Sequence, residues 1–345
     1  MKVYLPHNEL ERTSGIGKAI TKQIEYLQEE GINCVFRPEK GVDLVHINSI
    51  FDFKNIFILY GAHIGNVPLV THGHSTKQDW LNSFWFAKIT KPYVYKQIHD
   101  YYSFGDLVIT PTPYSRSLIL GYGYNDNVVT ISNGIDVDLS NKNIKENIEK
   151  FKTICNLKDD DQVVLGIGHP FLRKGIDDFF AVAKQFPNLK FVWCGHVPHI
   201  LLPRKVRKLL RHKPSNVIMP GFIDANAVRG AMHFSKCFFF PSREETEGIV
   251  VLESLACKCP LVIRDIGVYD YWLKDGVNCY KGLDCNDFTN IINKVLTSDS
   301  TKLVDNGFKL AKERDKSIIS KQLAQTYQRV IYEKQNRKEC IRKVR

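Results

Sequence analysis

The sequence predicts an α/β protein with two Rossmann-like domains facing an interdomain cleft. Short apolar segments alternate with segments of helical periodicity along the chain, which is typical of parallel α/β sheets. The 345 residues exceed one ordinary domain and suit two of about 150 residues each. Apolar residues make up 43% of the chain, enough for two cores, and the 25% of charged residues argue against disorder. Ligands of such sheets bind beyond the carboxyl ends of the strands.

The first half of the chain contains one series of strand-like segments. Between the first two segments, Ile16, Ile20, Ile24 and Leu27 recur at helical spacing, and Gly31 is placed to end that helix. The expected strands of this half are 2–5, 33–36, 44–47, 68–71, 107–110 and 128–131.

A polar stretch at 136–150 is the expected connection to a second series of strands. That series comprises 162–166, 190–193, 217–219, 237–240, 261–263 and 278–280. We therefore predict a first Rossmann-like domain at 1–150, a second at 151–315, and a C-terminal segment at 316–345. Ile319, Leu323, Tyr327 and Val330 form a helical pattern expected to pack back on the first domain, followed by a solvated basic tail.

The cysteines and the apolar pattern favour a soluble or peripheral cytoplasmic protein. Nine scattered cysteines are an odd number, so reduced thiols fit better than a disulfide framework. No apolar segment approaches the roughly 20 residues of a membrane span. The N-terminus reads as a strand instead of a signal peptide.

The net charge of +11 indicates an acidic partner. Nucleic acid, an anionic lipid and a phosphorylated substrate are all acidic partners, and the net charge alone does not distinguish them.

The sharpest motif is the segment 241–253, where an aromatic strand runs into a loop with four ionisable residues. An apolar helix begins at Gly248. The backbone amides of Gly248, Ile249 and Val250 at its N-terminus can bind a diphosphate. Glu245 precedes this helix and Glu253 lies within it. Because carboxylates repel phosphates, two carboxylates beside a diphosphate site are better suited to bind neutral hydroxyl groups of the same ligand. The alternative is an acidic N-capping loop on an ordinary core helix.

A second motif at 166–175 is again a strand that runs into a helix. Arg173 and Lys174 stand next to Gly175, and two cations at the carboxyl end of a strand can neutralise a leaving diphosphate. The alternative is a pair of solvated surface charges, so this motif indicates a binding site only in combination with the motif at 241–253.

Two weaker signals lie in the first domain. Gly15-Ile16-Gly17 follows the first strand but lacks the complete dinucleotide fingerprint, so a close-approach turn and a purely structural turn are both open. His74 follows the strand 68–71, where a histidine can orient an acceptor or contact the transferred group, or can simply be buried.

The stretch 80–104 mixes aromatic residues with lysines, as an interfacial helix does. We expect Pro92 to break it into two pieces, and a core-packed helix with snorkelling lysines is the alternative. A basic run at 204–208, with Arg211 and Lys213, is a second candidate for contact with anionic head groups. The residues predicted to meet a membrane or lipid acceptor are Trp80, Phe84, Trp85, Phe86, Lys88 and Lys91.

Together these motifs resemble the retaining GT-B-fold glycosyltransferases of family 4. The resemblance rests on the pair Glu245/Glu253, the element Arg173-Lys174-Gly175, the element 133–136 (Asn-Gly-Ile-Asp) and Gly15-Ile16-Gly17. Their order and spacing match the family along nearly the whole chain.

The resemblance implies that 1–150 is the acceptor and membrane-facing domain and that 151–315 is the nucleotide-sugar-binding domain. It also implies roles for individual residues. Glu245 would hold hydroxyls of a donor hexose and Glu253 the ribose. Arg173 and Lys174 would bind the diphosphate, with the amides of Gly248, Ile249 and Val250. Gly15, Ile16 and Gly17 would close over the phosphates, and His74 would match the acceptor-side histidine. His169 stands where many members have an arginine, which shifts part of the phosphate grip to Arg173. The resemblance makes Glu245, His74, Lys174 and Arg173 the expected catalytic residues.

A narrower resemblance links the second half to bacterial diacylglycerol and glycosyl-diacylglycerol glycosyltransferases. It rests on the segments 173–179, 191–193, 244–253 and 264–266. It implies transfer of glucose or galactose from a UDP-sugar to diacylglycerol or a monoglycosyl-diacylglycerol, giving an α-linked glycolipid. The expected setting is the inner face of the cell membrane with an anionic surface, and no metal or other cofactor, in keeping with the lack of an Asp-x-Asp motif.

Two other functions share part of this evidence. The same fold and donor chemistry suit a polysaccharide, soluble sugar or protein acceptor. A basic nucleic-acid-binding protein would explain the charge, but no recognisable module supports it, so no nucleic acid partner is expected.

Overall fold

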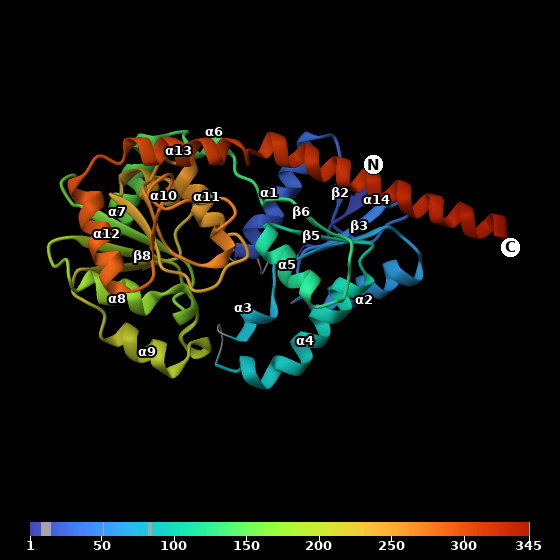
Figure 1. Ribbon diagram of the computed structural model, residues 1–345, viewed down its shortest axis with the longest axis horizontal. Coiled ribbons are helices and arrows are strands. Elements are labelled where there is room, and N and C mark those ends of the chain that lie inside the picture. The colour runs from blue at the N-terminus through green and yellow to red at the C-terminus, as the bar shows by residue number, and fades with distance from the viewer. Residues whose placement is uncertain (8–14, 51, 82–84, 345) are drawn as a thin grey trace. The chain divides into compact units, whose positions relative to one another are not determined.

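The computed structural model describes residues 1–7, 15–50, 52–81 and 85–344 (Figure 1). The chain forms two compact units. The first comprises Met1–Lys77, Ile89–Gly134 and Lys316–Arg345, and the second comprises Gln78–Lys88 and Ile135–Asp315.

The first unit is built on a parallel six-stranded sheet of order β2-β1-β3-β4-β5-β6. Its edge strand β6 pairs only with β5, with Ile109 opposite Val129. The strands are β1 (Lys2–Tyr4), β2 (Asn33–Val35), β3 (Leu44–Ile47), β4 (Leu69–His72), β5 (Leu107–Thr110) and β6 (Val128–Thr130).

Five helices of eight residues or more accompany this sheet within the described ranges. They are α1 (Gly15–Glu29), α2 (Phe53–Ile64), α4 (Ala87–Phe104), α5 (Pro113–Gly121) and α14 (Lys316–Val344). Helix α14 returns from the end of the chain and runs beside α1 (Figure 1), where Lys316 forms an ion pair of 2.7 Å with Glu29. Leu323, Tyr327 and Val330 of α14 enter the same apolar core as Ile20 and Leu27 of α1.

The second unit has its own parallel six-stranded sheet, of order β12-β11-β10-β7-β8-β9. Strands β10 and β7 are neighbours at its centre, with Phe238 opposite Leu165. The strands are β7 (Val163–Ile167), β8 (Lys190–Cys194), β9 (Val217–Gly221), β10 (Cys237–Phe240), β11 (Leu261–Arg264) and β12 (Tyr280–Gly282).

The core of the second unit is rich in aromatic rings. Phe179, Phe191, Trp193 and Phe239 are fully buried and pack edge-on or stacked. The helices around this sheet are α6 (Val137–Ser140), α7 (Ile144–Cys155), η2 (Leu172–Lys174), α8 (Ile176–Ala183), η3 (His199–Leu201), α9 (Arg204–Arg211), α10 (Ala225–Phe234), α11 (Ile249–Ala256), η4 (Gly267–Tyr269), α12 (Cys285–Thr297) and α13 (Thr301–Lys312). Helix α3 (Lys77–Leu81) spans the boundary between the two units in sequence.

The fold class predicted from the sequence is confirmed, because each unit is a parallel sheet with connecting helices. All twelve predicted strands are present, and the largest difference at either end of a strand is two residues, at β9 and β12. The expected solvated tail instead continues α14 to Val344.

The prediction that Pro92 breaks the stretch 80–104 is wrong, because Pro92 lies inside α4. Pro92 lies beyond the first turn of α4 and removes one backbone donor from the helix. Because Pro92 is exposed, water can satisfy the carbonyl that loses its partner. Trp85 and Phe86 form a turn directly before α4 begins at Ala87.

Within the described residues, none of the helices combines the length and the apolar character that crossing a bilayer requires.

Candidate functional site

The two strongest sequence motifs lie at the same edge of the second sheet. Residues 168–175 follow β7, and residues 241–248 follow β10. Because β7 and β10 are parallel neighbours, their carboxyl ends meet, and so do the loops that leave them. Sheet topology therefore joins segments about 70 residues apart in the sequence.

Lys174 and Glu245 form a buried ion pair at this edge. The ammonium of Lys174 donates to Oε1 of Glu245, and the hydroxyl of Ser242 donates to the same oxygen at 2.6 Å. The side chains of Lys174 and Glu245 are 15% and 8% exposed. Both charges are thus largely removed from water and compensated by each other.

Burial opposes ionisation of Glu245, but the nearby charges of Lys174 and Arg173 and the two hydrogen bonds hold the pKa of Glu245 below its ordinary value. Burial lowers the pKa of Lys174, while attraction to Glu245 opposes that effect. The carboxylate of Glu245 is therefore ionised at neutral pH.

Arg173 occupies the same edge with different partners. Its Nη1 donates to the carbonyl of Glu244 at 2.8 Å and to Oδ1 of Asp79 in α3 at 3.2 Å. Its side chain is 14% exposed. The site therefore holds two cations that are consecutive in sequence, each paired with a carboxylate.

Gly175 explains why the two loops pack so closely. Its φ of +77° is in the left-handed region, and a Cβ there would lie 2.3 Å from the carbonyl oxygen of Pro241. The amide of Arg243 donates to the carbonyl of Arg173 at 2.7 Å, which ties the loops together directly.

A network of charged side chains supports this junction from the side. The guanidinium of Arg243 contacts Asp177 at 2.7 Å and Asp178, both in the first turn of α8. Arg264 at the end of β11 donates to the same carboxylate of Asp178. The network fixes the loop after β10 against α8, which begins directly after Lys174 and Gly175.

Helix α11 starts at the far end of the second loop. Gly248 is its N-cap with φ of +85°, and the backbone amides that open the helix follow in Ile249 and Val250. Glu253 lies on the same helix, five residues after the cap. The helix start, Glu245 and both cations thus belong to one compact unit.

His169 lies close to the cations. Its Nδ1 donates to the carbonyl of His196 at 3.0 Å. Burial lowers the pKa of His169, opposed by this hydrogen bond, and the charges of Lys174 and Arg173 lower it further. His169 is therefore a neutral hydrogen-bonding group in this site.

The other predicted site residues lie in the first unit. Gly15, Ile16 and Gly17 form the first turn of α1 and not a free loop, while residues 8–14 before them are outside the described ranges. His74 is buried at the end of β4, and its Nε2 lies 3.2 Å from Oδ1 of Asn48.

The residues predicted to meet a membrane have mixed surroundings. Trp80 donates its indole N–H to the carbonyl of Ala87 at 3.2 Å and packs edge-on against Phe86. Trp85 is 59% exposed, and Lys88 and Lys91 are exposed. Phe84 lies outside the described residues.

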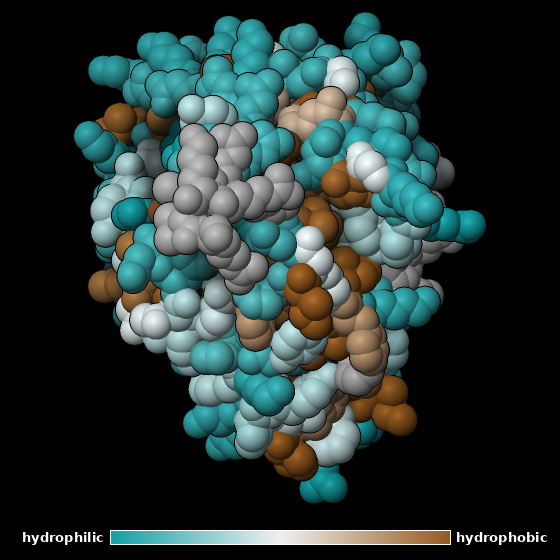
Figure 2. Space-filling model, turned by 90° about the vertical axis from the view of Figure 1, so that its right-hand side faces the viewer, coloured by the Kyte–Doolittle hydropathy of each residue, from teal (hydrophilic) through white to brown (hydrophobic). Residues whose placement is uncertain are grey.

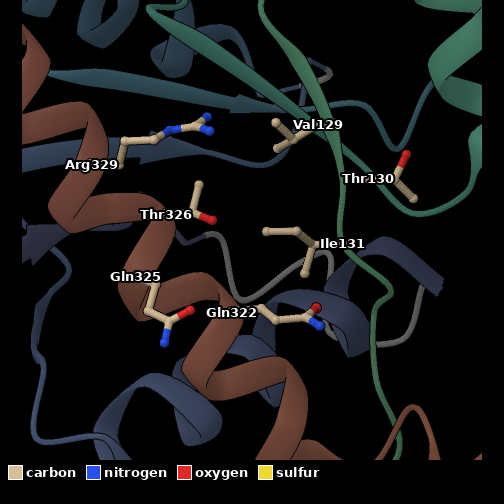
Figure 3. A pocket seen from close by; sticks show the side chains of 7 residues that line it. All are labelled: Val129, Thr130, Ile131, Gln322, Gln325, Thr326 and Arg329. Carbon is tan, nitrogen blue, oxygen red and sulfur yellow. The ribbon is translucent and has the colours of Figure 1, made fainter.

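A cavity of about 350 Å³ lies elsewhere, between β6 and α14 of the first unit (Figure 3). It is lined by Val129, Thr130, Ile131, Gln322, Gln325, Thr326 and Arg329, which are not among the predicted site residues. Among the described residues, no group of three or more His, Cys, Asp or Glu is arranged to hold a metal ion.

Sequence reasoning missed several residues of the site. Ser242 stands within the motif that was singled out, and its hydroxyl beside an acidic loop was the available signal. Asp79 reaches Arg173 from 94 residues away, and no local pattern could indicate that contact. Asn48, the partner of His74, also carries no local signal.

Two family models match the chain in succession. The model "Glycosyltransferase Family 4" matches residues 17–139, and "Glycosyl transferases group 1" matches residues 147–310.

The names of two relatives describe enzymes that act on lipids. The chain is 40% identical over 334 residues to the processive diacylglycerol alpha-glucosyltransferase of Acholeplasma laidlawii, covering 96% of this chain and 99% of that protein. It is 25% identical to the alpha-galactosylglucosyldiacylglycerol synthase of Streptococcus pneumoniae, covering 70% of this chain and 65% of that protein.

Solved structures share the fold. Anabaena HepE in complex with UDP and glucose matches with a TM-score of 0.76 at 18% identity, covering 94% of this chain and 98% of that chain. Sucrose-phosphate synthase from Thermosynechococcus elongatus matches with a TM-score of 0.77 at 16% identity, covering 96% and 99%.

The buried pair predicts a specific pH dependence of stability. Glu245→Gln leaves Lys174 buried without a charged partner, so the free energy of unfolding at pH 7 should fall by about 3 kcal/mol. Because the folded pKa of Glu245 lies below its ordinary value of 4.5, the stabilisation is complete above pH 4.5 and is lost as the pH falls through the folded pKa. Urea unfolding should therefore show the gap between variant and wild type closing in acid.

Glu149→Gln is the matched control, because Glu149 is 67% exposed in its pair with Lys152. It should change the free energy of unfolding by less than about 1 kcal/mol. A gap for Glu245→Gln that stays constant or widens below pH 4.5 would contradict the assignment of an ionised Glu245.

Proposed function

Because the chain belongs to the family 4 glycosyltransferases of the GT-B class, we propose that it transfers a hexose from a UDP-sugar to a membrane lipid and forms an α-linked glycolipid. The donor is UDP-glucose or UDP-galactose, and the acceptor is diacylglycerol or a monoglycosyl-diacylglycerol. The observation that carries the proposal is the pair of cations beside Glu245 at the carboxyl edge of the second sheet. The full-length match to a diacylglycerol glucosyltransferase supports the lipid acceptor.

In this proposal the two cations stabilise the leaving diphosphate. Transfer of a hexose leaves one additional negative charge on the diphosphate of UDP, and preorganised cations and amides stabilise that charge at little reorganisation cost. Arg173 and Lys174 supply the cations, and the amides at the start of α11 supply donors aligned with the positive end of the helix. His169 beside them adds a neutral hydrogen bond.

The two carboxylates bind hydroxyl groups in this proposal. A carboxylate accepts hydrogen bonds from hydroxyls but repels phosphate, so Glu245 suits the hexose and Glu253 suits the ribose. Glu245 accepts hydrogen bonds from Lys174 and Ser242. Binding of the donor would draw Lys174 towards the diphosphate and leave an oxygen of Glu245 for the sugar.

The acceptor side rests on the first unit. His74 is the group we assign to contact with the acceptor, and Gly15, Ile16 and Gly17 at the start of α1 are assigned to the phosphate side of the donor. The reaction retains the α configuration of the donor, and we propose that it needs no metal ion because fixed cations already meet the developing charge.

Contact with the membrane is assigned to α4 and its surroundings. Tyr60 and His63 of α2 pack on Phe104 of α4, so the two helices are neighbours. Four apolar side chains on these helices are exposed: Phe57 at 67%, Ile64 at 82%, Ile89 at 76% and Tyr93 at 49%. Figure 2 looks onto the first unit and shows apolar residues gathered on the lower part of this face.

Exposed lysines accompany the apolar residues of α4, as at a membrane interface. Lys88 and Lys91 are exposed on α4. In the second unit, α9 buries Val206 and exposes Arg204, Lys205, Lys208 and Arg211. Each such cation contributes about 1 kcal/mol near an anionic surface. We propose peripheral binding to the cytoplasmic face of the cell membrane.

The donor site is tested by transfer from labelled UDP-glucose or UDP-galactose to vesicles containing diacylglycerol or monoglucosyl-diacylglycerol. Lys174→Ala and Glu245→Ala should each lower the rate by about a hundredfold or more, because each removes a charge that faces the reacting groups. Lys184→Ala, an exposed lysine at the end of α8, is the control and should match wild type. Circular dichroism checks folding. A wild-type rate in either site variant rejects the assignment.

Membrane docking is tested by co-sedimentation with phosphatidylcholine vesicles, with and without phosphatidylglycerol. Trp85→Ser combined with Ile89→Ser should lower the bound fraction several-fold, since both side chains are exposed and little packing is lost. Tyr271→Ser, at a 65% exposed aromatic residue of the second unit, should bind as wild type does. Equal binding of the double variant and wild type to the vesicles would reject the assignment of this docking surface.

A further inference from the structure

Three imidazole rings form a buried column in the first unit. The rings of His46 and His72 are 5.4 Å apart and nearly parallel at 7°, and those of His72 and His74 are 3.9 Å apart at 4°. The three residues are 0%, 5% and 8% exposed. Neighbouring strands β3 and β4 carry the first two, and His74 follows β4 directly.

The column is uncharged at neutral pH. Burial lowers the pKa of His46 and of His74 to about 3, and it lowers the pKa of His72 well below its ordinary value. A neutral imidazole has one N–H donor and one acceptor nitrogen. What each ring can bind therefore depends on its tautomer and on the neighbours that select it.

The C-terminal helix selects the tautomer of His46. Nδ1 of His46 lies 2.5 Å from the hydroxyl of Tyr327 in α14 and 3.2 Å from Nε2 of Gln23 in α1. The amide nitrogen is only a donor, and burial raises the pKa of Tyr327 well above its ordinary value, so its hydroxyl keeps its proton. Both groups donate to Nδ1, which places the hydrogen of His46 on Nε2.

Asn48 selects the tautomer of His74. Nε2 of His74 lies 3.2 Å from the amide oxygen Oδ1 of Asn48, which can only accept. The hydrogen of His74 is therefore on Nε2, and Nδ1 carries the lone pair. Asn48 is 2% exposed, so water does not compete for this contact.

A cavity of about 10 Å³ borders the last two rings of the column. His72, His74, Gln23, Ser132 and Asn133 contribute its polar lining. This volume suits a single water molecule or hydroxyl group. Both ring nitrogens of His72 lack a hydrogen-bond partner among the described residues, and leaving a buried polar group unpaired is costly. The cavity thus offers space where a partner is needed.

We propose that Asn48 and Tyr327 are positioning residues that hold this imidazole column in the tautomers that receive a hydroxyl of the acceptor. The inference rests on the proposed function, since it names the groups that orient His74 for its substrate. Tyr327 acts through His46, which stacks on His72, which in turn stacks on His74. The C-terminal helix thereby contributes to the acceptor side from the far end of the sequence.

The tautomer also defines what His74 does. A ring with such a low pKa is a poor proton acceptor, so His74 orients the acceptor hydroxyl by accepting its hydrogen bond. The proton passes to the leaving diphosphate of UDP as the bond from C1 to the phosphate oxygen breaks and the bond from C1 to the acceptor oxygen forms. In the opposite tautomer Nδ1 would carry a hydrogen and would repel the hydroxyl proton. Loss of Asn48 should therefore act on turnover and leave donor affinity unchanged.

The first test reads the tautomers directly by long-range ¹H–¹⁵N correlation spectra of protein labelled at histidine, with His74→Gln and His46→Gln for assignment. Wild type should show the hydrogen of both rings on Nε2. Asn48→Leu should give a mixture of tautomers at His74, while Asn48→Asp, which keeps an acceptor oxygen, should preserve the Nε2–H form.

The second test compares kcat and KM for hexose transfer. Tyr327→Phe removes one hydroxyl and should lower kcat roughly five- to tenfold with an unchanged KM for the UDP-sugar. Asn48→Leu should lower kcat at least as much, and Asn48→Asp should recover part of it. Tyr332→Phe, a 65% exposed position on the same helix, is the control and should match wild type.

An Nδ1–H tautomer of His74 in wild type would overturn the inference, and this readout needs no variant and no activity. A loss of kcat in Asn48→Leu with an unchanged tautomer would reduce Asn48 to a structural role and would also overturn it. Failure of wild type to glycosylate any lipid would instead reject the proposed function, while the tautomer result would stand by itself.

Discussion

The buried ion pair between Lys174 and Glu245 is the interaction on which the donor side depends. Each charge is shielded from water, and each would be costly to leave alone in that position. The pair therefore holds together two loops that are 71 residues apart in sequence. The charge of Lys174 also favours ionised Glu245, so a sugar hydroxyl meets a carboxylate that is already oriented.

The backbone makes this pair geometrically available. Strands β7 and β10 are adjacent and parallel, and Gly175 lets the loop after β7 approach the carbonyl of Pro241. A side chain at residue 175 would both clash with that carbonyl and be strained at a φ of +77°. The charged network of Arg243, Asp178 and Arg264 then fixes the second loop against α8. Packing and electrostatics thus converge on the same two loops.

The sequence was sufficient for the features that are local in the chain. Strands of the second sheet such as β10 are short apolar runs followed by polar loops, and their order implies parallel pairing. The motifs around Lys174 and Glu245 stand directly after such strands, so their meeting could be expected from the fold class. The boundaries of α4 could not, because proline usually breaks or kinks a helix beyond its first turn, whereas α4 continues through Pro92.

Contacts between distant segments were beyond the reach of periodicity and motif. Asp79 meets Arg173 across 94 residues, and Tyr327 meets His46 across 281. The stacked histidines come from two strands, and only His74 was singled out in the sequence. Such partners are selected by tertiary packing, in which a buried polar group must find a complement wherever the chain supplies one.

The most direct measurement of the central claim is UDP binding by titration calorimetry to wild type, Lys174→Met and Glu245→Gln. If Lys174 binds the diphosphate and Glu245 faces the sugar, Lys174→Met should lower the affinity for UDP at least about tenfold, whereas Glu245→Gln should bind UDP as well as wild type does. Unchanged UDP affinity in Lys174→Met, or an equal loss in both variants, would contradict the division of roles on which the donor site is built.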